Sequence, residues 1–147
     1  MKTCTFFGHR DCPISIKPHL RSALIDLIEN KAIDTFYVGN QGAFDRLVYS
    51  LLQELSREYT HINYNMVLAY LPKNNPTLYS DFFNNAILPE GIETVPQRYA
   101  IAWRNNWMLE RTDLVVAYVT YSWGGASKFI NIAKQKGKCV INIADQL

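Results

Sequence analysis

The sequence has few cysteines, little net charge and no apolar run long enough to cross a bilayer. Its three cysteines form no Cys-x-x-Cys pair, which argues against a disulfide framework. The three histidines also lack metal-ligand spacing, so we expect neither a metal nor a cofactor. The longest apolar runs fall near residues 62–71 and 114–119, and the first residues show no signal-peptide pattern. These absences predict a cytoplasmic protein without a membrane segment.

The charge balance argues against a dedicated nucleic-acid binder. The formal net charge is only +2, whereas such proteins are strongly basic, so nucleic acid is expected to be an unlikely partner. The 147 residues, of which 48% are hydrophobic, are enough to bury one core. We therefore expect one domain over residues 1–147.

The apolar spacing predicts strands that alternate with helices. The expected strands cover residues 3–7, 35–38, 63–71, 113–119 and 138–143, and the expected helices begin near Pro18, Phe44 and Pro96 and after Gly125. Such alternation predicts a Rossmann-like three-layer α/β/α domain, with a mainly parallel, doubly wound sheet of about five strands. The pattern weakens over residues 77–96, which we expect to form an excursion over a sheet edge or over the site.

Three of the expected strands end in polar loops that contain glycine. The loops are Gly8-His9-Arg10, Gly39-Asn40-Gln41-Gly42 and Trp123-Gly124-Gly125-Ala126-Ser127. Each could be only a tight turn. In parallel sheets, however, ligands sit beyond the carboxyl ends of the strands, and amides at a helix N-terminus can hold a phosphate. The three loops together therefore favour a nucleotide or phosphate site.

One stretch resembles a known family. A helix is expected over residues that include Arg104-Asn105-Asn106-Trp107-Met108, an apolar strand follows, and Gly124-Gly125 opens the next helix. This order resembles the SLOG superfamily of Rossmann-like nucleotide-binding proteins, which includes the LOG phosphoribohydrolases, the DNA-processing protein A domain and the YpsA-like proteins. Residues 5–10 and 36–39 are most similar to the small YpsA-like branch. The resemblance implies a nucleotide ligand and a homo-oligomer, a dimer or higher.

The sequence departs from the LOG motif at the positions that carry its chemistry. Asn105 replaces the lysine, Ser127 the third glycine, Lys128 the threonine and Asn131 the glutamate. An amide cannot act as a general base or carry the charge of a carboxylate. We therefore expect binding of a nucleotide or nucleotide-derived metabolite, such as a nucleoside phosphate or an ADP-ribose-like molecule, by a sensor or sequestering module.

Two other functions remain open. The first is a LOG-like N-glycosidic hydrolase acting on nucleoside monophosphates or related N-glycosides, with Glu90 or Glu93 as its catalytic acid. The second and weaker alternative is single-stranded DNA binding, by analogy with DNA-processing protein A.

Each candidate residue also has a plainer interpretation. Arg104 suits a phosphate because of its planar fork, but it could form a surface ion pair. His9 and Arg10 could contact a phosphate or base, or His9 could cap a turn. Asp45 could bind a ribose hydroxyl or complement a helix dipole, and Cys12 could be a thiol of lowered pKa. The full set of ligand candidates is Gly8, His9, Arg10, Gly39, Asn40, Gln41, Asp45, Arg98, Arg104, Trp123, Gly124, Gly125, Ala126 and Ser127.

Three aromatic residues recur at four-residue steps on one expected helix: Tyr99, Trp103 and Trp107. Such a stripe is typical of a core or a subunit interface, with base stacking as the minority interpretation.

Overall fold

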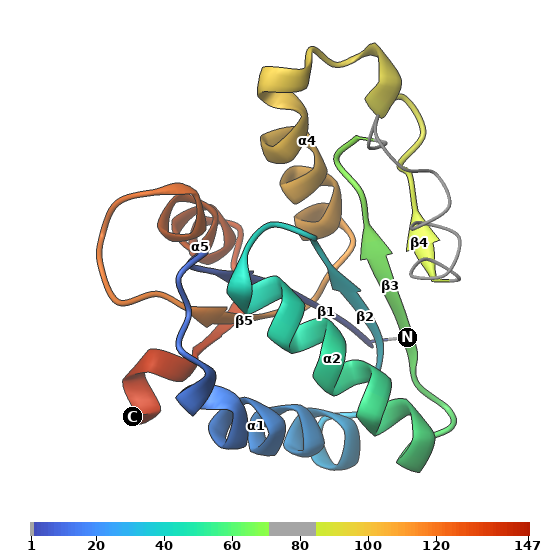
Figure 1. Cartoon of the computed structure of the whole chain (residues 1–147), viewed down its shortest axis with the longest axis vertical. Helices are drawn as coiled ribbons and strands as arrows, with labels where there is room; N and C mark the ends of the chain where they lie inside the picture. The colour runs from blue at the N-terminus through green and yellow to red at the C-terminus, as the bar shows by residue number, and fades with distance from the viewer. Residues whose placement is uncertain (1, 71–84) are drawn as a thin grey trace.

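The computed structural model describes residues 2–70 and 85–147, and strands alternate with helices along the chain (Figure 1). The strands are β1 (Lys2–Gly8), β2 (Ile33–Val38), β3 (Asn63–Val67), β4 (Ala86–Ile87), β5 (Leu114–Tyr118) and β6 (Cys139–Asn142). The helices are α1 (Lys17–Asn30), α2 (Ala43–Glu58), α4 (Gln97–Glu110) and α5 (Gly125–Gln135), with short 3-10 turns η1 (Ile14–Ile16), η2 (Ile92–Thr94) and η3 (Ile143–Gln146).

The strands form one parallel sheet in the order β4-β3-β2-β1-β5-β6. From β1 the chain builds outward through β2, β3 and β4, and then crosses back to place β5 on the other side of β1. The order therefore reverses between β1 and β5, where Cys4 pairs with Leu114 and Gly8 with Tyr118. The predicted Rossmann-like parallel fold is confirmed.

Two apolar cores lie on the two faces of the sheet, because successive side chains of a strand point to opposite sides. On β5, Leu114 and Val116 belong to the core under α1 and α2, which lie side by side in Figure 1, whereas Val115 and Ala117 belong to the core under α4 and α5. On β1, Phe6 joins the first core and Phe7 the second.

The predicted helix ends agree with the structure. Pro18 lies in the first turn of α1 and Pro96 is the N-cap of α4, two positions where the missing amide of proline costs nothing. Gly137 follows the C-cap of α5 with a φ of 75°, as expected of a C′ glycine.

The third strand is shorter than predicted. It ends at Val67 rather than at residue 71, and Leu68 and Ala69 are buried after the strand has ended. Leu68 still donates its N–H to the Ile87 carbonyl oxygen of β4 at 2.9 Å, so the apolar run predicts the strand correctly up to its last paired residue and overextends it beyond that point. The sheet also has six strands rather than about five, the extra one being the two-residue β4. Residue 71, the expected loop at residues 72–76 and the start of the expected excursion lie outside the described residues.

Candidate functional site

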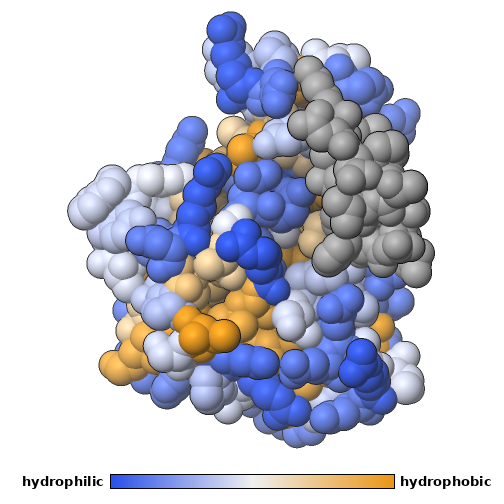
Figure 2. Space-filling model, in the orientation of Figure 1, coloured by the Kyte–Doolittle hydropathy of each residue, from blue (hydrophilic) through white to orange (hydrophobic). Residues whose placement is uncertain are grey.

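A pocket with a volume of about 320 Å³ opens at the carboxyl ends of β1 and β5, where the strand order reverses. It lies between the loop after β1, the start of α2, the middle of α4 and the start of α5. In Figure 2, hydrophilic side chains gather over the middle of the face where α2, α4 and α5 meet. The lining residues are Phe6, Phe7, Gly8, His9, Arg10, Asp11, Gln41, Asp45, Ile101, Arg104, Asn105, Met108, Tyr121, Gly124, Gly125 and Ala126.

The structure brings most of the predicted ligand residues to this pocket. Those that line it are Gly8, His9, Arg10, Gln41, Asp45, Arg104, Gly124, Gly125 and Ala126. They come from the end of β1 and the loop after it, the loop before α2 and the first turn of that helix, the middle of α4, and the start of α5. The parallel arrangement of β1, β2 and β5 places the three loops at the same end of the sheet.

Arg104 lies inside the protein with only 1% of its surface exposed. Its Nη1 donates to the carbonyl oxygen of Val67 at 3.0 Å and to Asn40 Oδ1 at 3.3 Å, and its Nε donates to Asn105 Oδ1 at 2.8 Å. The surface ion-pair interpretation is therefore wrong for Arg104. It fits Arg111 instead, whose exposed guanidinium lies 3.9 Å from a carboxylate oxygen of the neighbouring Glu110.

Two further candidates, Gly39 and Asn40, lie next to Arg104 but do not line the pocket. A Cβ atom on Gly39 would lie 2.9 Å from Arg104 Cζ and 3.0 Å from Asp45 Oδ2. Asn40 supplies one of the hydrogen-bond acceptors of Arg104. Neither Gly39 nor Asn40 lines the pocket, so each acts on it through Arg104.

Asp45 is a buried carboxyl in the first turn of α2, and it faces the pocket. Its Oδ2 accepts from the Gln41 N–H at 2.8 Å. Burial raises the pKa of Asp45 to about 6, against the opposing effects of the Gln41 amide and of the charges on Arg104 and Arg10. The Asp45 side chain therefore holds the loop before α2 through the Gln41 amide. It also lies in the first turn of α2, where a negative charge complements the helix dipole.

His9 is 6% exposed and joins β1 to the loop after β5. Its Nε2 accepts from the Thr120 N–H at 2.9 Å, so in the neutral ring the proton lies on Nδ1. The ring stacks on Tyr121 with 3.7 Å between centroids, and burial lowers the pKa of His9. His9 therefore holds a distant loop and does not cap its own turn.

Gly125 differs from the other glycines of the pocket. A Cβ atom on Gly8 would lie 2.3 Å from the ring of Phe44, so the packing itself requires that glycine. A Cβ on Gly125 would meet nothing within 4 Å. No side chain caps the N-terminus of α5, where Gly125 is the first residue. The backbone at Gly125 is left open toward the pocket.

The remaining ligand candidates lie outside the pocket lining. Ser127 is buried within α5, Trp123 is 68% exposed beside the pocket, and Arg98 is exposed on α4, where its guanidinium lies 4.8 Å from the ring centroid of Tyr99. Sequence reasoning missed Tyr121 and Asp11, both of which line the pocket. The position of Asp11 directly after Arg10 was the available signal for it.

The structure places the two predicted catalytic acids away from this pocket. Glu90 borders a separate hollow with Trp103, Asn106, Trp107, Glu110 and Arg111, and Glu93 is exposed in η2. Among the described residues, the acidic groups that line the pocket are Asp11 and Asp45.

Other expectations are settled by burial. Cys12 is buried, and this burial raises the pKa of its thiol to about 11, so the lowered pKa suggested by the sequence is wrong. The predicted aromatic stripe of α4 packs only in part. Trp107 packs edge-on against Tyr37 at 5.6 Å and Trp103 packs against the small core of Ala69, Ile92 and Ala100, whereas Tyr99 is 54% exposed. Within residues 2–70 and 85–147, no cluster of metal-ligating side chains occurs. Over the same residues, no helix has the length and apolar character needed to span a bilayer.

The fold has counterparts among solved structures. No family model and no curated protein matches the sequence. DNA processing protein A of Streptococcus pneumoniae superimposes with a TM-score of 0.70 at 13% identity, over 95% of this chain and 49% of that one. DNA processing protein A of Helicobacter pylori, described for its single-stranded DNA binding mode, gives 0.66 at 13% identity over 99% and 71%. The chain thus spans about half the length of the Streptococcus protein, and at this identity the likeness shows that it shares the Rossmann-like fold of these proteins.

Proposed function

We propose that the chain binds a nucleotide or a nucleotide-derived metabolite, with a phosphate of the ligand in the pocket between β1 and β5. The observation that carries this proposal is Gly125, a glycine that the packing of the protein does not require. It lies at the N-terminus of α5 and lines the pocket. A missing side chain at this point lets an anion reach the first amides of the helix.

The charges around the pocket support an anionic ligand. Arg104 and Arg10 line it, and the helix dipole of α5 adds about 0.3–1 kcal/mol for an anion at its N-terminus. Asp45 faces the same pocket in a position suited to a ribose hydroxyl. Because burial raises the pKa of Asp45 to about 6, its repulsion of an anion weakens as the pH falls through that value.

The geometry favours binding over hydrolysis. Asn131, which replaces the LOG glutamate, is exposed on α5 and does not line the pocket. Glu90 and Glu93 lie elsewhere, so the hydrolase alternative loses the acids on which it depended. We therefore favour a sensor or sequestering module over a hydrolase.

The test is a thermal-shift panel of AMP, ADP and ADP-ribose on two charge-matched variants. Gly125→Asp places a carboxylate where the phosphate would lie, whereas Asn131→Asp places the same charge on the outer face of the same helix. We expect stabilisation of the wild type and Asn131→Asp by at least one ligand, and its loss in Gly125→Asp. Equal stabilisation of both variants, or none of the wild type, would overturn the proposal.

Single-stranded DNA is the second candidate ligand. The specific observation in its favour is the shared fold with the Helicobacter protein, whose described ligand is single-stranded DNA. This weakens the expectation that nucleic acid is an unlikely partner. Retention of an oligonucleotide that falls steeply as salt rises would support it, and no retention at low salt would remove it.

We also propose that the chain forms a homo-oligomer, a dimer or higher. Light scattering tests this proposal separately, because it gives the molar mass of the protein in solution.

A further inference from the structure

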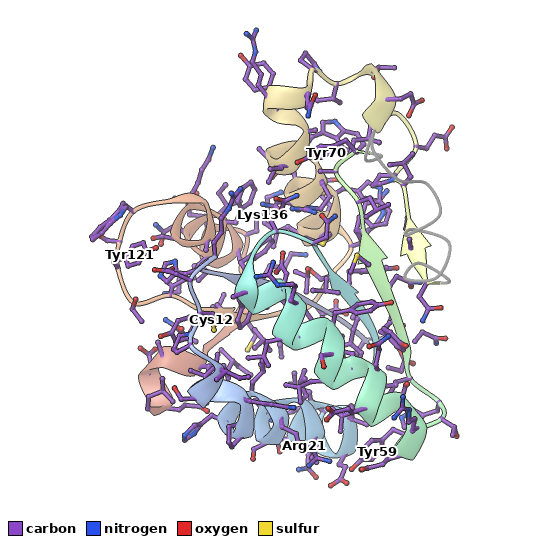
Figure 3. The ribbon with its side chains drawn as sticks, in the orientation of Figure 1. Cys12, Arg21, Tyr59, Tyr70, Tyr121 and Lys136 are labelled. Atoms are coloured by element: carbon purple, nitrogen blue, oxygen red, sulfur yellow. The ribbon has the colours of Figure 1, made fainter. Side chains whose placement is uncertain are left out.

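Three aromatic rings form a stack from the end of β1 to the solvent beside the pocket. His9 stacks on Tyr121 with centroids 3.7 Å apart and planes 8° from parallel, and Tyr121 stacks on Trp123 at 4.3 Å and 24°. Exposure rises along this aromatic ladder from 6% at His9 to 68% at Trp123. Figure 3 shows Tyr121 on the loop between β5 and α5, away from the helices that cover the sheet.

The ladder is anchored at its buried end. The His9 N–H donates to the Tyr118 carbonyl oxygen at 3.2 Å, and His9 Nε2 accepts from the Thr120 N–H at 2.9 Å. The first bond holds His9 to the end of β5, and the second holds it to the loop that follows β5. A ligand that stacks on the outer end therefore meets a surface that is already ordered, which lowers the entropic cost of binding.

Only the outer end of the ladder is open to a ligand. The two faces of Tyr121 are covered by His9 and Trp123, so this tyrosine is a positioning residue. Among the described residues, Tyr121 is the only aromatic partner found for Trp123, and it covers one face of the indole. An isolated exposed tryptophan needs no explanation, but this one is held in a stack beside the pocket.

The position of Trp123 suits one part of a nucleotide. It directly precedes Gly124, which lines the pocket, and its Cα lies at most about 7 Å from that of Gly125. Resting on the proposed function, we infer that the outer face of Trp123 stacks the base of the nucleotide whose phosphate lies at the start of α5. Because every base presents a π-face, the class of ligand is a purine or pyrimidine nucleotide without a strong base preference.

The test compares AMP with ribose 5-phosphate, which keeps the phosphate and sugar but has no base, by calorimetry. We expect Trp123→Ala to weaken AMP binding by about 5- to 150-fold, and Trp123→Phe to recover part of the loss. Neither change should alter ribose 5-phosphate binding. Tyr99→Ala is the matched control, because Tyr99 is a 54% exposed aromatic residue on α4 that does not line the pocket.

The outcomes separate this inference from the proposed function. If neither AMP nor ribose 5-phosphate binds the wild type, both fall. If both bind and Trp123→Ala changes the two affinities equally, or changes neither, the pocket stands and the stacking role is wrong. Because Trp123 is exposed, its removal is not expected to unfold the chain, and circular dichroism of each variant verifies this.

Discussion

Arg104 Nη1 lies 3.0 Å from the carbonyl oxygen of Val67, and this buried hydrogen bond ties the middle of α4 to the end of β3. The same guanidinium is a neighbouring charge of Asp45 and helps to hold the pKa of that carboxyl down against burial. One side chain therefore joins α4 to the end of β3 and to the loop after β2, and it also balances a charge in the pocket.

Replacing Arg104 with methionine should destabilise the fold. It leaves the Val67 carbonyl without its donor and removes the positive charge that opposes the effect of burial on Asp45. Losing a hydrogen bond from a charged group costs about 1.5–3 kcal/mol. Urea unfolding at pH 8 measures the loss, and at pH 5, where Asp45 is largely protonated, the loss should be smaller. Arg111→Met removes an exposed guanidinium that lies over the ring of Trp107, and it should change the unfolding free energy by less than about 1 kcal/mol. Equal losses at the two pH values would argue against the charge interaction between Arg104 and Asp45.

Asp45→Asn should remove a pH dependence of stability. The pKa of Asp45 is about 6 in the folded chain and 3.8 as its ordinary value, so the folded state binds more protons between these values. The wild type therefore loses stability as the pH rises from 4 to 6, by about 3 kcal/mol in full. Unfolding free energies measured over this range should fall for the wild type and be flatter for Asp45→Asn. Parallel curves would contradict the raised pKa.

His9→Gln should change the pH dependence in the opposite sense. Burial lowers the pKa of His9 below its ordinary value of 6.5, so the unfolded state binds more protons and the stability from His9 is lost as the pH falls below about 6.5. Protonation of Nε2 also removes the acceptor of the Thr120 N–H. The wild type should lose more stability than His9→Gln between pH 7 and 5, whereas the exposed His19→Gln should behave like the wild type.

Two glycine-to-alanine variants should separate packing from ligand approach. Gly39→Ala brings a methyl group against Arg104 and Asp45 and should cost about 1–3 kcal/mol as overpacking. Gly125→Ala meets open space and should leave the stability unchanged or raise it by up to about 1 kcal/mol, since alanine favours a helix. Thermal unfolding gives both values. A large loss in Gly125→Ala would mean that the glycine serves the fold.

The sequence predicted the elements with strong local patterns and the loops that parallel strands bring together. The apolar spacing of α1 and α2 is local, and the glycine loops follow from the strand direction. The two-residue β4 has no such pattern. The apolar run also gives no sign that pairing with β4 stops at Leu68 while burial continues to Ala69.

Within the site, the missed features depend on contacts between distant segments. The burial of Arg104 and the stacking of His9 on Tyr121 arise only when α4 and the loop after β5 close on β1. The positions of Glu90 and Glu93 depend on the path of the chain after β4. Sequence spacing contains none of these distances.

The pairing of β1 with β5 also bears on how the chain folds. The Thr3 N–H donates to the Asp113 carboxylate across 110 residues of sequence, and closing so long a segment is slow because its entropy is lost before the contacts form. The same pairing brings together the loops that follow β1 and β5, where His9 Nε2 accepts from the Thr120 N–H beside the pocket. A ligand of the pocket would therefore recognise only chains in which β1 has paired with β5, and the onset of binding during refolding would report when that pairing forms.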